Sequence, residues 1–141
     1  TISSTDSSAV TVSDNLQVNG TLTATSITGV TVLTNGTVSD GTATTTASTI
    51  ANLDTFTAAT YRSAKYEVSI SDSTNSRYAL HTIHVTHDGS NAYIVDTVVS
   101  STGSSMATFT ADIDSGNVRV RIVPISSDST TYKFVRTAIN V

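Results

Sequence analysis

Three histidines, His81, His84 and His87, recur at three-residue spacing and are the residues of this chain best suited by type to bind a metal. On a helix this spacing would gather three imidazoles on one face. The β-branched residues between them favour a strand, on which His84 faces away from the other two and His81 lies about 20 Å from His87. We therefore predict no metal site and interpret all three as surface or rim histidines. The alternative is one histidine that contributes to an interface site between symmetry-related chains.

A serine nucleophile is the second chemistry that the residue types suggest. Serine and threonine make up about a third of the sequence, so a serine close to a histidine carries little information. Gly103-Ser104-Ser105-Met106 lacks the second glycine of a nucleophile elbow and is typical of a loop between strands. Glu67 is the one glutamate, and most aspartates fall in expected turns, where their side chains cap the backbone. We predict that the chain is not an enzyme and has no catalytic, cofactor-binding or metal-binding residues.

Arginines near the end of the chain suggest a binding surface of a different kind. Arg119, Arg121 and Arg136 would form a small basic patch if their strands are neighbours. We expect them to pair with Asp112 or Asp114 across a hairpin, because surface charges usually remain solvated or weakly paired. A docking surface for an acidic partner is the alternative.

Three tyrosines and two asparagines have both a binding and a structural interpretation. Tyr61, Tyr78 and Tyr93, if exposed, would stack on a sugar ring, although core or interface tyrosines are commoner. Asn19-Gly20-Thr21 and Asn35-Gly36-Thr37 match the N-glycosylation sequon. We interpret both as Asn-Gly turns that lead into threonine-rich strands, because Thr1-Ile2-Ser3-Ser4 does not begin a secretory signal.

The charge balance and the apolar pattern exclude several partners. The net charge is -4 and the isoelectric point is near 5.0, whereas nucleic-acid binding demands a basic stripe. The sequence has no cysteine, so no disulfide can stiffen the fold. No apolar run approaches the roughly 18 residues of a membrane span. We predict neither a nucleic-acid nor a membrane partner.

Two parts of the chain differ in composition. Every Lys and Arg lies at Arg62 or later, and every Tyr and Phe at Phe56 or later. We place the boundary between a Thr/Ser-rich anchoring segment, residues 1–52, and a β-domain, residues 53–141. In the first part Val10, Leu16 and Leu22 repeat at six-residue spacing, which fits either coils of a β-solenoid or irregular short strands. Residues 47–53 are predicted to form a short helical turn as a connector.

The second part alternates apolar and polar residues with the period of strands. Turns are expected at 72–76, 87–91, 100–104, 114–117 and 126–130. The strands between them are predicted at 66–70, 77–87, 92–100, 107–113, 118–122 and 131–138. The predicted fold class is all-β, an antiparallel β-sandwich or jelly-roll-like domain after a Thr-rich extended or short-strand N-terminal segment. Aromatic residues in its strands should let it fold alone, whereas residues 1–50 need support from partners to be ordered.

Several segments resemble virion structural proteins of tailed phages, particularly phages of marine cyanobacteria. The resemblance rests on LDTFTAATYRSAKY from Leu53, on His87-Asp88-Gly89 and on ADIDSGNVR from Ala111. It implies a virion component without catalytic residues. Our hypothesis is a non-enzymatic protein at the virion surface, either a head decoration or cement protein or a short fibre, that forms a homotrimer and binds capsid or tail subunits. A carbohydrate-binding adhesion module for host surface glycans is the alternative, and a glycan depolymerase is a remote third.

Overall fold

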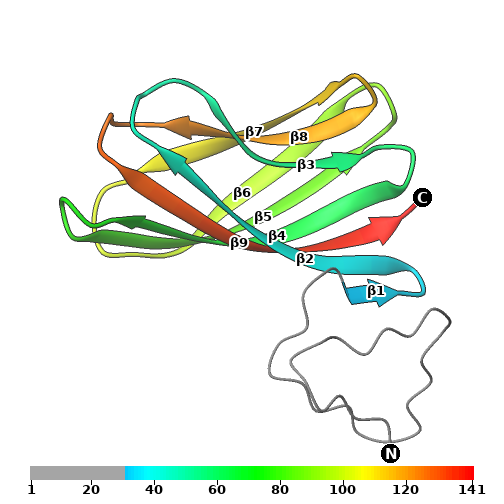
Figure 1. Cartoon of the computed structure of the whole chain (residues 1–141), viewed down its shortest axis with the longest axis horizontal. Coiled ribbons are helices and arrows are strands. Elements are labelled where there is room, and N and C mark those ends of the chain that lie inside the picture. The colour runs from blue at the N-terminus through cyan, green and yellow to red at the C-terminus, as the bar shows by residue number, and fades with distance from the viewer. Residues whose placement is uncertain (1–30) are drawn as a thin grey trace, which may run out of the picture.

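The computed structural model describes residues 31–141, and Figure 1 traces the nine strands of this part of the chain. The strands are β1 (Thr31–Leu33), β2 (Gly36–Thr45), β3 (Ala51–Thr57), β4 (Tyr61–Asp72), β5 (Arg77–His87), β6 (Ala92–Ser101), β7 (Ala107–Asp114), β8 (Asn117–Pro124) and β9 (Thr130–Asn140). The predicted repeat of Val10, Leu16 and Leu22 and the Asn19 sequon lie outside the described residues. No helix within residues 31–141 has the length and apolar character needed to cross a bilayer.

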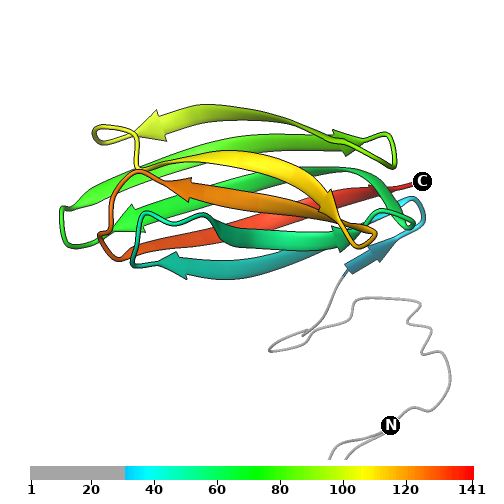
Figure 2. The same cartoon turned by 90° about the horizontal axis from the view of Figure 1, so that it is seen from above.

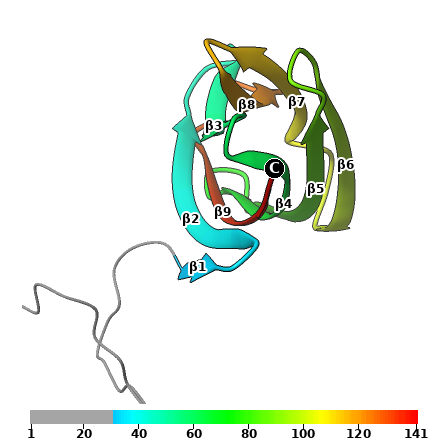
Figure 3. The same cartoon turned by 90° about the vertical axis from the view of Figure 1, so that its right-hand side faces the viewer.

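The strands form two antiparallel sheets that pack face to face. One sheet has six strands in the order β1-β2-β9-β4-β5-β6, and the other has three in the order β3-β8-β7. Figure 3 shows the larger sheet curving around the smaller one. The predicted all-β class and antiparallel sandwich are confirmed.

Alternation along the strands explains why the two sheets pack on each other. On β4, Tyr66, Val68 and Ile70 are fully buried, while Ser69 between them is exposed. β8 buries Val118, Val120 and Ile122 in the same way and turns its arginines outward. Each such aliphatic side chain stabilises the fold by about 1.5–3 kcal/mol when it leaves water. The core therefore lies between β4, β5 and β9 on one side and the three-stranded sheet on the other.

Two turns have backbone conformations that their residues explain. Ser115 and Gly116 both have positive φ, 51° and 80°, which suits the tight hairpin between β7 and β8. At the β4–β5 turn the Asp72 carboxylate is buried and accepts hydrogen bonds from Asn75 and Arg77. These bonds lower the pKa of Asp72 to about 2, with Asn75 as the larger cause. Both turns occur where the sequence predicted them.

Residues 47–53 do not form the predicted helical turn. Residues 46–49 are bends, and β3 begins at Ala51 and pairs with β8. A β-bulge between Asn52 and Asp54 interrupts the register, so Leu53 and Phe56 both point into the core at a spacing of three. That spacing hides the period of two by which a strand is recognised, which is why the prediction was wrong.

β2 joins the same sheet as the strands that follow it. It pairs with β9 through ten residue pairs, from Gly36↔Ile139 to Thr45↔Thr130. Figures 1 and 2 show the β1–β2 hairpin and the C-terminus at the same end of the molecule. There Asn140 donates its backbone N–H to the Asn35 carbonyl at 3.0 Å. Asn35 lies in the turn between β1 and β2, and Gly36 begins β2, so the predicted Asn-Gly turn occurs at this place.

Candidate functional site

The outer face of the six-stranded sheet contains a groove of about 560 Å³. Four strands line it, with Ser63 and Lys65 from β4, His84 and Thr86 from β5, Tyr93 and Val95 from β6, and Thr137 and Ile139 from β9. Tyr93, Val95 and Ile139 are exposed apolar side chains, whereas Ser63, Thr86 and Thr137 are short and carry hydroxyl groups. The groove therefore combines apolar surface with hydroxyl groups that can donate and accept hydrogen bonds.

Hydrogen bonds orient the side chain of Tyr93, a residue that is 55% exposed. Its hydroxyl donates a hydrogen bond to Asp88 Oδ2 at 3.0 Å. The other carboxylate oxygen accepts the backbone N–H groups of Ser90 at 2.8 Å and Asn91 at 2.7 Å. These bonds hold the pKa of Asp88 well below its usual range, and the bond to Asp88 raises the pKa of Tyr93. The β5–β6 turn thus holds an aromatic ring at the edge of the groove.

A single ion pair lies beside the groove. Lys65 Nζ is 2.8 Å from Glu67 Oε1, and Thr82 donates its hydroxyl to Glu67 Oε2 at 2.9 Å. The bond from Lys65, followed by that from Thr82, lowers the pKa of Glu67. Because Glu67 balances the charge of Lys65, the pair adds little net charge to the groove.

The three histidines lie on opposite sides of β5, as the alternation predicted. His84 is exposed on the outer face, while His81 and His87 are buried. His81 Nδ1 is 2.7 Å from the Asp96 carboxylate, and its ring packs edge-on against Phe109. The interpretation of His81 and His87 as surface or rim residues was therefore wrong. His81 can be buried because the neighbouring strand β6 supplies a carboxylate for it.

His87 is held in one tautomer by the β5–β6 turn. Its Nδ1 accepts the backbone N–H of Gly89 at 3.1 Å, so the ring proton is on Nε2, which donates to the Tyr61 carbonyl at 2.7 Å. Both ring nitrogens are thereby occupied. In the part of the chain that the structure describes, no three His, Asp or Glu side chains converge as metal ligands would.

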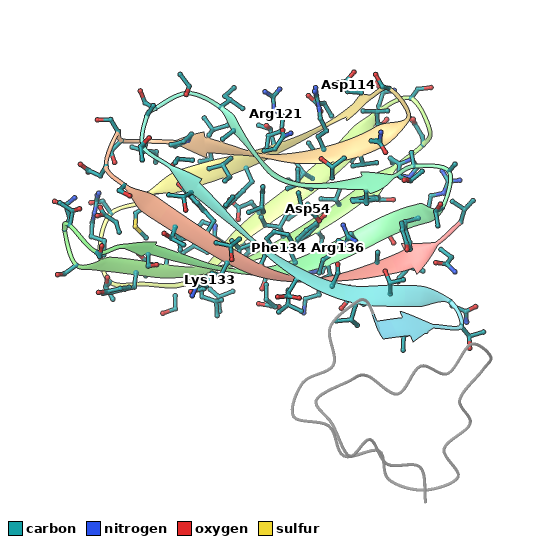
Figure 4. The ribbon with its side chains drawn as sticks, viewed as in Figure 1. Asp54, Asp114, Arg121, Lys133, Phe134 and Arg136 are labelled. Carbon is teal, nitrogen blue, oxygen red and sulfur yellow. The ribbon has the colours of Figure 1, made fainter. Side chains whose placement is uncertain are left out.

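Arg119 and Arg121 pair across the β7–β8 hairpin as predicted. Arg119 contacts Asp112 at 2.7 Å and Asp114 at 2.6 Å, and Arg121 contacts Asp112 at 3.3 Å. Figure 4 shows Arg121 and Asp114 at the three-stranded sheet, on the other side of the molecule from Lys133. The hydrogen bond from Arg119, the largest cause, lowers the pKa of Asp112.

Arg136 does not join that patch, because it lies between the two sheets (Figure 4). Its Nη1 donates to Asp54 Oδ2 at 2.6 Å, and the same oxygen accepts the Tyr66 hydroxyl at 3.0 Å. The guanidinium also stacks over the Phe56 ring at 5.7 Å. Burial, followed by the charge of Asp54, raises the pKa of Tyr66 far above its usual value. Sequence reasoning missed this cluster, although Asp54 lies in a strand rather than in a turn.

The other predicted positions are divided between core and surface. Tyr61 is half-buried and meets Phe56 edge-on, which fits the core interpretation and not stacking on a sugar ring. Tyr78 and Tyr93 are exposed, as a stacking role requires. Ser104 lies in the loop between β6 and β7, where the sequence placed it.

β6 forms one margin of the six-stranded sheet (Figure 2) and is the second notable surface. It has ten residues and, among the strands that the structure describes, pairs with β5 alone. A bulge sets Leu80 opposite Ser100 and His81 opposite Val98, which leaves Val99 between them. Val98 and Val99 are 52% and 57% exposed. The one charged residue of β6, Asp96, is hydrogen-bonded to His81. Its charge is therefore not available to oppose pairing of β6 with another strand.

At the other sheet edges of the described chain, β1, β3 and β7 have features that usually prevent edge pairing. β1 has only three residues and pairs with residues 36–38 of β2, so residues 39–45 of β2 have no neighbour on that side among the described strands. β3 contains the bulge beside Asp54, and β7 has two aspartates paired with arginine. β6 is long, has no proline, lysine, arginine or glutamate, and presents valines to solvent. An unprotected apolar edge of this kind is a template for pairing with another chain.

Comparisons with known proteins gave matches among solved structures alone, since no protein-family model and no curated protein matches. The tailspike protein gp49 from Acinetobacter baumannii bacteriophage Fri1, a capsular polysaccharide depolymerase, is 9% identical, with a TM-score of 0.43 over 79% of this chain and 19% of that chain. The Acinetobacter phage vB_ApiP_P1 tailspike is 19% identical, with a TM-score of 0.40 over 86% and 25%. The A. baumannii phage AM24 tailspike is 10% identical, with a TM-score of 0.36 over 75% and 26%.

The chain spans between 19% and 26% of these tailspike chains. The prediction that the chain is not an enzyme is contradicted by this comparison, because gp49 is a depolymerase. The TM-scores describe a partial likeness of fold, so every residue assignment rests on this chain alone. The finer resemblance to phages of marine cyanobacteria stays a prediction.

Proposed function

We propose that this chain is a β-sandwich module of a phage virion fibre or tailspike, and that it assembles with copies of itself by pairing along β6. The virion role rests on the sequence resemblance at Leu53, His87 and Ala111. The observation that carries the assembly role is the unprotected edge of β6.

Backbone pairing is the interaction that this edge offers. In an antiparallel ladder the N–H and C=O groups of alternate residues point away from the neighbouring strand, here β5. A second strand would satisfy them, at about 0.5–1.5 kcal/mol per hydrogen bond. The same contact would remove Val98 and Val99 from water. The partner edge must be low in charge, because β6 has no exposed charge to pair with it.

The number of copies follows from which edges meet. Pairing of β6 with β6 is isologous and closes as a dimer, whereas a ring of three requires β6 to meet a different edge of the next copy. We propose the trimer, the oligomer hypothesised from the sequence, in which β6 meets residues 39–45 of β2, the part of that edge that β1 does not cover. A head decoration role would instead have β6 bind capsid subunits, so that the free protein is monomeric and gains its partner on the particle.

Light scattering of the purified full chain tests the proposal. We expect the mass of three chains, and a monomer for a double variant with Val98→Lys and Val99→Lys, because lysine on an edge opposes pairing. Val135→Lys is the matched control, since Val135 is an exposed valine on β9, away from the β6 edge. It should keep the wild-type mass. A monomeric wild type, or a double variant with the wild-type mass, would contradict the assembly through β6.

A further inference from the structure

We propose that the groove on the outer face of the six-stranded sheet binds a neutral saccharide, with Tyr93 as the surface on which a pyranose ring stacks. This inference goes beyond the assembly role and does not depend on it. Pairing along β6 extends the sheet at its edge, while the groove lies on the face of β9, β4, β5 and β6.

The dimensions of the groove suit a ligand of this class. Its volume of about 560 Å³ lies within the range of small-molecule sites, roughly 300–1,000 Å³. A pyranose ring has an apolar C–H face and a rim of hydroxyl groups. Tyr93, Val95 and Ile139 supply apolar surface, and an aromatic ring with a polar tip is well suited to such an amphipathic ligand.

Tyr93 is prepared for binding before a ligand arrives. Its hydrogen bond to Asp88, together with the turn that fixes Asp88, holds the side chain in place. An exposed side chain that is already ordered loses less conformational entropy on binding, a loss of about 0.5–1.5 kcal/mol for a free one. The bond also uses the hydroxyl and leaves the ring faces for contact.

The polar residues of the groove match hydroxyl groups rather than a charged ligand. Ser63, Thr86, Thr137 and His84 can each donate or accept hydrogen bonds, which is what a sugar hydroxyl requires. The charge of Lys65 is balanced by Glu67 at 2.8 Å. With no unbalanced charge among its lining residues, the groove favours a neutral sugar over a uronic or sialic acid.

The test is a titration of the full chain, followed by amide NMR, with three probes: cellohexaose, maltohexaose and chitohexaose. We expect at least one probe, at concentrations up to about 10 mM, to shift the amides of Ser63, Thr86 and Tyr93. Tyr93→Ala should weaken binding about tenfold, which corresponds to about 1.4 kcal/mol. Tyr93→Phe keeps the ring but loses the bond to Asp88, and we expect a smaller loss of about twofold to fivefold.

Tyr78→Ala is the matched control, because Tyr78 is a similarly exposed tyrosine of β5 that does not line the groove. It should bind the probe like the wild type. The proposal is overturned if no probe shifts these amides, or if Tyr78→Ala weakens binding as much as Tyr93→Ala. It is also overturned if Tyr93→Ala lowers the assembly mass while no probe binds, since the groove is then a protein contact. Retained binding in the Val98 and Val99 lysine variant would separate this site from the assembly.

Discussion

At the scale of single residues, the link between the two sheets depends on Arg136. It bonds to Asp54 of the three-stranded sheet, and both side chains are largely buried, with 11% and 18% exposure. The Tyr66 hydroxyl donates to the same carboxylate. Removal of one partner from a buried pair leaves the other charge without compensation.

We expect Arg136→Met to lower the free energy of unfolding by about 3 kcal/mol, because Asp54 would keep only its bond to Tyr66. Urea denaturation followed by circular dichroism measures this. Lys133→Met, on the same strand but exposed, is the control and should change stability by less than about 0.5 kcal/mol. Equal effects of the two substitutions on the free energy of unfolding would show that the Arg136–Asp54 pair does not stabilise the fold.

Tyr66 makes the fold sensitive to alkaline pH. Its pKa in the folded protein is raised above the ordinary value of 10.0, chiefly by burial. The folded state therefore holds the proton more tightly than the unfolded state. The resulting stability is complete below pH 10 and is lost as the pH rises beyond it, at about 1.4 kcal/mol per pH unit for one group.

Denaturation at a series of pH values above 10 would measure that loss. Tyr66→Phe should reduce the slope, and the remaining slope belongs in part to Tyr132, whose pKa burial also raises. A variant slope equal to that of the wild type would mean that Tyr66 ionises as easily in the folded protein as in the unfolded chain.

At the scale of strands, two glycines of β2 lie where the neighbouring strand β9 leaves no room for a side chain. A Cβ atom at Gly36 would collide with the backbone carbonyl oxygen of Ala138, and one at Gly41 would lie 2.6 Å from the Phe134 ring. A backbone neighbour can move less than a side chain, so Gly36 is the stricter position. Gly103 has room, since its nearest atom would be Cδ of Arg77 at 3.9 Å.

We expect Gly36→Ala to lower stability by about 1–3 kcal/mol, the usual cost of overpacking, and Gly41→Ala to have a smaller effect. Gly103→Ala should be close to neutral. Thermal melting of the three variants compares them directly. A Gly36→Ala protein as stable as Gly103→Ala would mean that β2 does not pair with β9 in the register described.

The sequence predicted those elements whose signals are local. β5 was placed at its observed bounds because an Asp-Gly turn follows a run of alternating residues. A threonine-rich strand was expected after Asn35-Gly36, but its place in the sheet beside β9 was not predicted, because the Thr, Ser, Gly and Ala of β2 give it no apolar alternation. Gly41 is small because Phe134 lies against it. The Asp54–Arg136 pair joins residues 82 positions apart, and such a distance leaves no local pattern. The groove likewise combines residues of four strands that only the topology brings together.

At the scale of the whole molecule, the position of β2 is relevant to the predicted boundary between residues 52 and 53. It covers one side of β9 and contacts Phe134 through Gly41. A chain of residues 53–141 would leave β9 as an edge with unpaired backbone groups. We expect a chain of residues 31–141 to melt at a higher temperature than one of residues 53–141. Equal melting temperatures would support an independent β-domain from residue 53 and a dispensable β2.

The proposed assembly and the proposed saccharide site would use different parts of one sheet. Edge pairing employs the free backbone groups of β6, and the groove employs side chains on the outer face. A sheet extended across several chains would repeat the groove at regular intervals. Several weak sites held together in this way bind a repeating polymer more tightly than one site does.

Hydrogen exchange at β6 tests the central claim most directly. If β6 pairs between chains, its alternate amides that point away from β5 should exchange slowly in the wild type and quickly in the Val98 and Val99 lysine variant. The amides of β7, the corresponding edge of the smaller sheet, should exchange alike in both proteins. Fast exchange of the outward β6 amides in an assembled wild type would contradict the account, because the chains would then be joined elsewhere.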